Sequence, residues 1–517
     1  MDIKKALRID DSSRIGTTAS SPFIGSPGFD EVPFQVHSGV TPALNSFVVV
    51  ERDGTDVLHY GRITTGREEN PRADPALLQK NSAYQIGQKD PRQSDKSPHV
   101  TRTMVVEVLG EVHLEDGELA VREPSMLAQT GKAVYEFPPE QMSWLLNLPK
   151  RREDGIHLGS VASGAKTVDI FLPDEMIPRQ TTICGRTGTG KSYAAGVLAE
   201  ELVAHGIPVI SFDILGDLIK ATDELGGRNF RAGVDFRVPY ATIGLSEFLA
   251  FVNLTSQQRE LVEMAYETLA DEAHNTLDKT GKVTMPYERL YDEIRSVGAS
   301  TGQAAVAERA VQRVKSAFNR NELLTEKTEE WLVELTRKPM LNVFIGHLSQ
   351  NKRSLVVGAA VRMLQTLRRR DRVPPFALII DEAHLLLPSG NEHTASTAVL
   401  REMVRTARHH SVGVILITQS PSSMDKGALL ACNTRIVFAL DRDDLRLLSG
   451  TMGDLSDEAI ARIPKLPKGT AIITASPEIM RHSAQVRIRR RKTTAGAPTP
   501  NMREEVQKWR SRRSTKA

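Results

Sequence analysis

The sequence predicts an α/β protein whose main domain is a doubly wound parallel sheet with a helical insertion, preceded by a small β-barrel. Three observations predict this fold class. From about residue 180, apolar strands alternate with helical patterns, as in a parallel sheet covered by helices. Residues 245–335 keep the 3.6-residue period of helices. Before residue 173, short strands separated by turn residues favour a barrel.

Length and composition limit the class of protein. A chain of 517 residues predicts two or three domains, and 40% hydrophobic with 25% charged residues is typical of a globular protein. The longest apolar runs, such as Val412–Ile417, are too short to span a bilayer, and the N-terminus lacks a secretory signal. Cys184 and Cys432 alone exclude a disulfide framework. We expect a cytoplasmic protein without membrane association.

The N-terminal domain is predicted to span residues 1–172. Its first 35 or so residues are rich in Ser, Gly, Pro and Asp and predict an irregular leader. The stretch from Asn70 to Pro98 predicts a long loop. The expected barrel strands are Ser46–Val50, Val57–Thr64, Thr101–Leu109, Leu119–Arg122 and Thr167–Phe171.

The main domain is predicted to span residues 173–490, with the helical insertion at about 245–335. Expected helices include Ser192–His205, Gln258–Leu277, Ala304–Phe318 and Leu355–Arg370. The expected strands are Thr181–Cys184, Pro208–Phe212, Leu341–Ile345, Phe376–Ile380, Val412–Thr418, Arg435–Leu440 and Thr470–Ala475.

Positive charge is concentrated at the C-terminus. Residues 487–517 hold eleven Lys and Arg against two Glu, so this end carries +9 while the net charge of the whole chain is +3. Residues 491–517 therefore form a predicted basic tail. Such a tail either contacts a phosphate backbone or is a solvated terminus, and the sequence favours neither interpretation.

The segment Gly185–Ser192 matches the phosphate-loop pattern at every fixed position, between an apolar strand and a helix. Its glycines allow successive backbone N–H groups to point at phosphate oxygens. Lys191 is expected to reach the β- and γ-phosphates, and the hydroxyl of Ser192 to ligate Mg²⁺. The predicted nucleotide-binding residues are Gly185, Arg186, Thr187, Gly188, Thr189, Gly190, Lys191, Ser192 and Tyr193.

Two acids follow the apolar strand Phe376–Ile380. We expect Asp381 to lie beside the metal ion and Glu382 to polarise the attacking water as a general base. The strand Val412–Thr418 ends at Gln419, which is our predicted sensor of the γ-phosphate, with Thr418 as a second candidate. Together these elements predict a RecA-like P-loop ATPase core that uses ATP and Mg²⁺.

Arginines spaced by three residues follow one helix in the segment Arg401–His410, so they share a face. In a ring-shaped motor, one of them would reach a neighbouring copy's γ-phosphate and stabilise charge in the transition state. The pattern alone favours a solvated basic helix face, which is common.

With these motifs in order, the chain resembles the HerA family of hexameric DNA translocases over most of its length. Beyond the phosphate loop and the acids, the resemblance rests on four further segments. They are Ile210–Asp217, whose Asp213 and Gly216-Asp217 look like the family's second-strand signature, Arg405–Gly413, Thr418–Pro421 and Cys432–Thr434 before a strand.

The resemblance implies a homohexamer that threads double-stranded DNA, with a barrel of the HAS type at its N-terminus. It makes Arg408 the candidate trans-acting arginine, and it places Arg179 near the nucleotide at the subunit boundary. It further implies a NurA-type nuclease partner in DNA end resection and repair. The alternatives are an ATP-loaded ring that activates an effector in defence against phage, and a soluble conjugation- or secretion-type motor.

The sequence departs from the family pattern at three places. Gly346-His347-Leu348-Ser349 lacks a frequent acidic residue, Ala407-Arg408-His409-His410 replaces a usual Gly-Arg-Lys-Phe, and Ser420 replaces a frequent Arg. The first two changes leave the expected chemistry intact. The third puts in doubt any phosphate or interface contact that the Arg makes elsewhere in the family.

Overall fold

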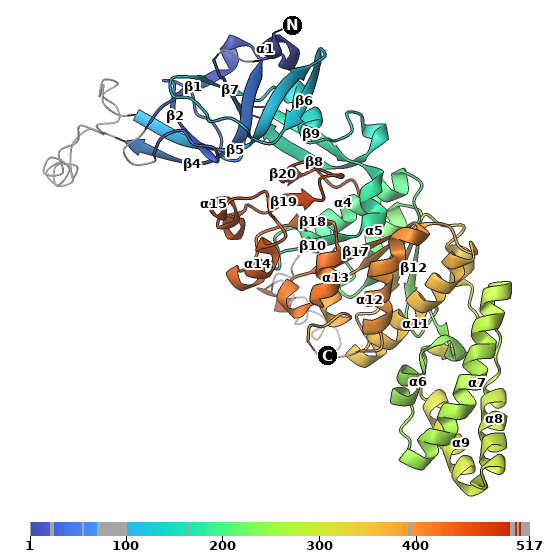
Figure 1. The fold of residues 1–517 in the computed structure, drawn as a ribbon. Helices are drawn as coiled ribbons and strands as arrows, with labels where there is room; N and C mark the ends of the chain where they lie inside the picture. Colours follow the sequence, from blue (N-terminus) through green and yellow to red (C-terminus); the bar gives the residue numbers. More distant parts are fainter. Residues whose placement is uncertain are drawn as a thin grey trace, which may run out of the picture.

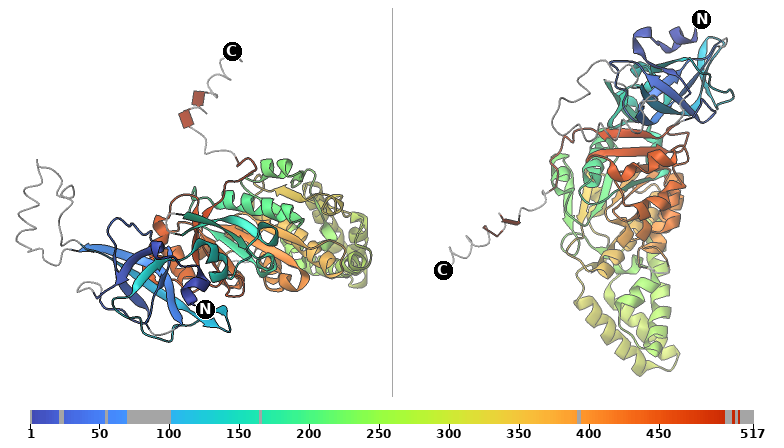
Figure 2. Two further views of the ribbon diagram at one scale, coloured as in Figure 1. Left: turned by 90° about the horizontal axis from the view of Figure 1, so that it is seen from above. Right: turned by 90° about the vertical axis from the view of Figure 1, so that its left-hand side faces the viewer.

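The computed structural model describes residues 2–20, 25–53, 56–69, 101–163, 166–390, 394–496, 502–503 and 506–507. A β-barrel lies at one end of the molecule, a large sheet covered by helices lies in the middle, and a helical arm extends from the other end (Figures 1 and 2). The loop expected at Asn70–Pro98 and most of the basic tail expected at 491–517 lie outside the described residues.

The N-terminal sheet closes into a barrel. Its strand order is β2-β1-β7-β3-β4-β5-β6, and an additional pairing of β2 with β5 closes six of these strands while β6 continues the sheet from β5. All of its ladders are antiparallel. The strands are β1 (Arg14–Thr18), β2 (Glu31–Val36), β3 (Phe47–Val50), β4 (Val57–Glu69), β5 (Thr101–Glu115), β6 (Glu118–Arg122) and β7 (Ala133–Glu136).

Strand β3 explains how the barrel is attached to the rest of the chain. Successive side chains of a strand point to opposite faces of the sheet. Val48 and Val50 lie in the core inside the barrel, whereas Phe47 and Val49 lie in the core shared with the main domain. Both faces of β3 are therefore buried. The hydrophobic effect stabilises the barrel through one face and its attachment to the main domain through the other.

Two predictions for the N-terminal region are wrong. The expected irregular leader contains the helix α1 (Ile3–Leu7) and the barrel strands β1 and β2. The strand expected at Thr167–Phe171 is present as β9 (Lys166–Leu172), but it pairs with β8 (Ile156–Ser163) at the edge of the large sheet. We therefore propose that the domain boundary lies before Ile156 rather than after residue 172.

The large sheet confirms the predicted α/β class. Its strand order is β12-β15-β11-β16-β17-β10-β18-β19-β20-β8-β9, in which β12 through β18 are parallel and the remaining pairings are antiparallel. Its other strands are β10 (Thr181–Cys184), β11 (Val209–Asp213), β12 (Arg228–Arg231), β15 (Met340–Phe344), β16 (Phe376–Ile380), β17 (Val412–Thr418), β18 (Thr434–Val437), β19 (Thr470–Ala475) and β20 (Ala484–Ile488).

Helices cover the large sheet and form the arm. The arm consists of α6 (Leu245–Phe251), α7 (Ser256–Thr280), α8 (Tyr287–Ser300) and α9 (Ala304–Asn319) (Figure 1), which confirms the predicted insertion. A two-stranded sheet of β13 (Val238–Pro239) and β14 (Leu324–Thr325) adjoins it. The remaining helices are α3 (Met142–Leu145), α4 (Lys191–Ala204), α5 (Ile219–Glu224), α10 (Trp331–Glu334), α11 (Gln350–Arg369), α12 (Thr397–Thr406), α13 (Lys426–Ala431), α14 (Arg442–Ser449) and α15 (Asp457–Ile460).

A polar seam joins the barrel to the main domain. Arg62 of β4 is buried, and it donates to the carbonyl oxygens of Ser483 at 2.9 Å and Asp454 at 2.8 Å. The hydroxyl of Tyr60 and Nε2 of His482 form a hydrogen bond of 2.7 Å. Burial lowers the pKa of His482 from 6.5 to about 4, although Asp454 acts in the opposite direction.

This histidine predicts an acid-sensitive junction. His482 is neutral in the folded chain below its ordinary pKa, so the unfolded chain binds more protons between pH 6.5 and about 4. The stability that neutral His482 confers is complete above pH 6.5 and falls as the pH is lowered toward 4, by roughly 1–2 kcal/mol for a partly exposed group. Denaturant unfolding of wild type and His482→Gln across this range measures the effect. Parallel curves for both proteins would contradict the assignment.

Candidate nucleotide site

The phosphate loop Gly185–Ser192 connects the end of β10 to the start of α4. Gly188 and Gly190 have φ of +80° and +126°, a region that L side chains rarely adopt. A Cβ at Gly185 would lie 2.6 Å from Cβ of Phe438, so this glycine permits close packing of the loop on the end of β18. The loop ends at the N-terminus of a 14-residue helix, where the helix dipole favours an anion.

Lys191 is the first residue of α4 and is 8% exposed. Its Nζ donates to the carbonyl oxygen of Arg186 at 3.2 Å, so the side chain crosses its own loop. Burial lowers the pKa of Lys191, while the carboxylates of Glu382 and Asp381 act in the opposite direction. The ammonium group therefore lies within electrostatic reach of both predicted acids.

Asp381 lies at the end of β16, next to Asp213 at the end of the adjacent strand β11. Burial, together with the charges of Asp213 and Glu382, raises the pKa of Asp381 to about 7. Burial also raises the pKa of Asp213, although the N–H groups of Gly216 and Leu218 donate to it at 2.7 and 3.0 Å. Buried carboxylates so close together favour a bound cation.

Glu382 has a backbone conformation that costs energy. Its φ is 45° and its ψ is 50°, in the left-handed region, and such strain is often found at functional sites. The residue is 8% exposed, and Oε2 is buried without a hydrogen-bond partner among the described residues. Nδ1 of His384 lies 3.4 Å from this oxygen and 3.2 Å from Oγ1 of Thr418. An unsatisfied buried carboxylate oxygen can accept a hydrogen bond from a water molecule.

Gln419 follows β17, which lies between β10 and β16 in the sheet. Its Oε1 accepts a hydrogen bond of 2.8 Å from Oγ1 of Thr187 in the phosphate loop. The structure therefore brings Gln419 to the loop itself, whereas Thr418 contacts His384. Gln419 therefore lies between the phosphate loop, which follows β10, and the acids, which follow β16.

Arg186 and Tyr193 make their contacts within the protein. The guanidinium of Arg186 donates to the carbonyl oxygen of Pro464 at 2.8 Å and lies 3.4 Å from Asp441. The hydroxyl of Tyr193 accepts a hydrogen bond of 2.5 Å from the backbone N–H of Arg491. Both residues therefore link the phosphate loop and its helix to segments that come later in the chain.

Arg179 and Arg408 lie at the opposite edge of the sheet from the phosphate loop. Arg179 ends the 3₁₀ turn η5 (Asp174–Arg179) before β10, and Arg408 lies in η8 (Ala407–His410) before β17. The seven residues of β17 extend about 20 Å, and its end is level with that of β10. The structure therefore does not bring these arginines to their own phosphate loop. Arg408 is exposed, and Arg179 pairs with Glu478.

Asp213 and Asp217 are members of the site to which the sequence motifs gave no chemical role. Asp213 and Asp381 come from adjacent parallel strands, and Asp217 acts electrostatically on Asp213, Asp381 and Lys191. The signal that could have found Asp213 was available, because Asp213 lies at the end of a buried strand, as Asp381 does. Placing Asp213 beside Asp381 also requires the pairing of β11 with β16, which the motifs do not give.

Comparisons with known proteins agree with this geometry. Residues 156–364 match the family model described as "Helicase HerA, central domain". The DNA double-strand break repair helicase HerA of Sulfolobus acidocaldarius is 21% identical over 89% of this chain and 91% of its own length. The protein of the same name from Pyrococcus furiosus is 22% identical over 87% and 88%. The structure of VirB4 of Thermoanaerobacter pseudethanolicus, 18% identical, covers 66% of this chain and 97% of its own with a TM-score of 0.51, which supports the fold.

A glycine loop between a strand and a helix, with two acids on a nearby parallel strand, defines a P-loop ATPase. Among P-loop ATPases, the match to the HerA central domain and the similarity along most of the chain point to HerA proteins as its relatives. The chain is therefore similar to the HerA family, whose central domain is matched at residues 156–364, and it is an ATPase. No described helix has the length and apolar character needed to cross a membrane.

Proposed function

We propose that this chain is an ATP-driven motor that moves double-stranded DNA through a ring of identical copies, most simply a hexamer. The observation that carries the proposal is the placement of the phosphate loop and the acids at one edge of the sheet, with Arg408 at the other edge. Relatives similar over most of their length carry the name DNA double-strand break repair helicase. A repair role with a nuclease of the NurA type is part of the proposal.

In this proposal, ATP binds with its phosphates on the loop Gly185–Ser192. Lys191 contacts the β- and γ-phosphates, and Gln419 senses the γ-phosphate from its contact with Thr187. Glu382 accepts the proton of the attacking water, for which its Oε2 is suited because it has no hydrogen-bond partner among the described residues. Through this contact, Gln419 links the presence or loss of the γ-phosphate to the phosphate loop.

The residues present fit Mg²⁺. The buried charges of Asp213, Asp381 and Glu382 favour a cation, while the described residues hold no cluster of three His, Cys, Asp or Glu that could bind a metal alone. Mg²⁺ commonly binds through substrate phosphates, water and one or two protein groups. Ser192 would supply the hydroxyl, and Asp381 would hold a bound water. When bound, Mg²⁺ neutralises negative charge on the phosphates.

The proposed ring gives the two distant arginines a role. Because a head-to-tail ring places one edge of each copy against the opposite edge of the next, Arg408 and Arg179 of one copy would face the phosphates of its neighbour. Residues 407–410 contact the segment that ends at Arg179, so both arginines would arrive together. Arg179 would leave Glu478, whose side chain is 67% exposed, when it meets a phosphate.

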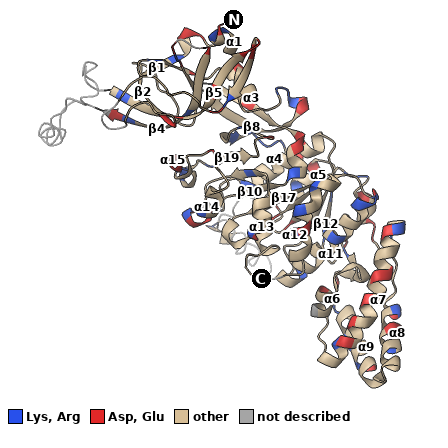
Figure 3. Cartoon of the chain, in the orientation of Figure 1, with Lys and Arg blue, Asp and Glu red and all other residues tan. Residues whose placement is uncertain are grey.

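ATPase assays with and without duplex DNA, together with the native mass of the assembly, test the function. We expect a ring-sized assembly whose ATPase rate rises several-fold with duplex DNA and whose DNA binding weakens steeply with salt. In the part of the chain that the structure describes, positively and negatively charged residues are interspersed over the arm and the main domain, without a broad basic region (Figure 3). We therefore expect the DNA contacts to be confined to the central channel of the proposed ring. A monomer with DNA-independent ATPase activity and no binding at low salt would contradict the proposal.

A further inference from the structure

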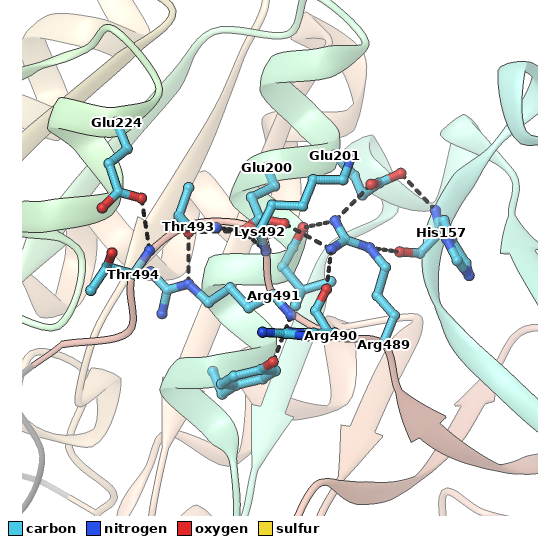
Figure 4. A network of polar contacts seen from close by, with 12 residues as sticks. His157, Glu200, Glu201, Glu224, Arg489, Arg490, Arg491, Lys492, Thr493 and Thr494 are labelled. Atoms are coloured by element: carbon cyan, nitrogen blue, oxygen red, sulfur yellow. Dashed lines mark hydrogen bonds and ion pairs between the residues drawn. The ribbon is translucent and has the colours of Figure 1, made fainter.

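The segment after β20 crosses the helix that begins at the phosphate loop. Residues 489–496, here called the C-terminal strap, run across α4 and contact α5 (Figure 4). The strap ends beside Asp217. Arg491–Gly496 belong to the stretch for which the sequence predicted a basic tail. In the structure, Arg491 is buried against the main domain while Lys492 is exposed, so Arg491 is not part of a solvated tail. The preceding Arg489 is also mostly buried.

The strap is anchored on the second half of α4 by two buried acids. Glu200 accepts hydrogen bonds from the backbone N–H of Lys492 at 2.8 Å and of Thr493 at 2.7 Å, and from the hydroxyl of Thr493 at 2.8 Å. The guanidinium of Arg489 lies between both acids, 2.8 Å from Glu200 and 2.6 Å from Glu201. Breaking such a buried charged network by removing one partner is costly, so the anchor fixes the path of the strap.

Arg491 lies on the first two turns of α4, next to the phosphate loop. Its backbone N–H donates to the hydroxyl of Tyr193, which directly follows Ser192 in the chain. Its side chain, 6% exposed, lies over Gly196, where a Cβ would be 2.2 Å from Cζ of Arg491. Only glycine at position 196 leaves room for this guanidinium. Nη2 of Arg491 is buried with no hydrogen-bond partner among the described residues.

The other end of the strap contacts the acidic loop of the nucleotide site. The N–H of Thr494 donates to Glu224 of α5 at 2.7 Å. Gly496 packs so closely on Asp217 that a Cβ would be 2.5 Å from Oδ1 of this aspartate. Asp217 interacts electrostatically with Arg491 as well as with Lys191 and Asp381. The strap therefore connects the first turns of α4 to the loop that holds Asp217.

We propose that Arg491 is a positioning residue for ATP hydrolysis, which acts by holding the first turns of α4 against the acidic loop at Asp217. The inference rests on the proposed nucleotide site at Lys191, Ser192 and Asp381. Arg491 itself touches neither the phosphate loop nor the acids. It fixes Tyr193 and Gly196 on one side and balances the charge of Asp217 on the other. ATP turnover then depends on a segment about 300 residues away in sequence.

Three variants and two controls test this proposal. Arg491→Gln removes the charge, Arg491→Lys keeps it, and Gly196→Ala fills the space that the guanidinium occupies. Lys492→Ala is the matched control, because this exposed residue contributes only its backbone N–H to the anchor. A chain ending at residue 496 keeps the strap and removes the residues beyond it. Each protein is assayed for kcat and KM of ATP hydrolysis and for its melting temperature.

We expect Arg491→Gln and Gly196→Ala to lower kcat/KM roughly tenfold, within the range of couplings between residues in contact. Arg491→Lys should retain part of the kcat/KM that Arg491→Gln loses. Both controls should keep kcat/KM within about twofold of wild type. Combining Arg491→Gln with Asp217→Asn should cost less than the product of the two single effects, because both act on the same loop. A purely structural residue would change the melting temperature without this coupling.

Two outcomes separate this inference from the proposed site. If Lys191→Ala retains full ATPase activity, the proposed site is wrong. If Lys191→Ala is inactive while folded Arg491→Gln has wild-type kcat/KM, the site stands and the positioning role is wrong. Strict additivity of the Arg491→Gln and Asp217→Asn effects would also overturn the role of Arg491.

Discussion

Glu382→Gln is expected to lower the ATPase rate by at least about a hundredfold while ATP still binds. The reason is the position of the carboxylate. Glu382 is held in a strained left-handed conformation at the end of β16, and its Oε2 is buried without a hydrogen-bond partner among the described residues. The amide of Gln keeps the size of the side chain but cannot accept a proton from water. The proposed contacts of Lys191 and Ser192 with the phosphates would be unchanged by this substitution.

The measurement is a steady-state ATPase assay paired with equilibrium binding of a fluorescent ATP analogue. Glu118→Gln on the exposed end of β6 is a suitable control for a general effect of removing a carboxylate. It should hydrolyse ATP at the wild-type rate. A Glu382→Gln protein that turns over ATP normally would show that another group accepts the proton.

Arg408→Ala is expected to lower the ATPase rate of the assembly by about a thousandfold, the lower range for arginines supplied in trans. Arg408 is exposed at the edge of the sheet opposite the phosphate loop, so this loss would not come from a contact within its own copy. The guanidinium would stabilise charge that develops on the neighbour's γ-phosphate.

Arg405→Ala provides the control for this prediction. Arg405 is also exposed, three residues earlier at the end of α12, so its removal changes the local charge equally. We expect this variant to keep most of its activity, and native mass should show both variants fully assembled. Equal losses in the two variants would indicate a general electrostatic effect rather than a specific role of Arg408.

The sequence was sufficient to predict which residues lie together at the carboxyl edge of the sheet. The phosphate loop needs glycines at fixed positions, and Gly188 and Gly190 have the positive φ that explains them. Asp381 and Gln419 each follow an apolar strand, and parallel strands end at one edge, so their proximity could be inferred. The Asp213 side chain joins the same edge through the pairing of β11 with β16.

Long-range pairings explain what the sequence could not predict. Residues 166–172 form a strand as expected, but their sheet is set by β20, which comes about 300 residues later. Strands β1 and β2 lie in a segment rich in turn-forming residues, and pairings with β7 and β5 order them. Arg489 and Arg491 belong to a run of basic residues typical of a solvated tail. Their partners Glu200 and Glu201 lie on a helix far earlier in the chain, which local composition does not reveal.

A mixing experiment tests the central claim, that each ATP site is completed by a neighbouring copy, most directly. Lys191→Ala chains lack a working phosphate loop but supply Arg408, and Arg408→Ala chains have the converse defect. Each variant alone should be inactive. In a random equal mixture, roughly a quarter of the boundaries would pair an intact loop with an intact arginine. We therefore predict recovery of ATPase activity toward a quarter of the wild-type rate per chain. Mixed rings that remain inactive at every ratio, although fully assembled, would contradict the account.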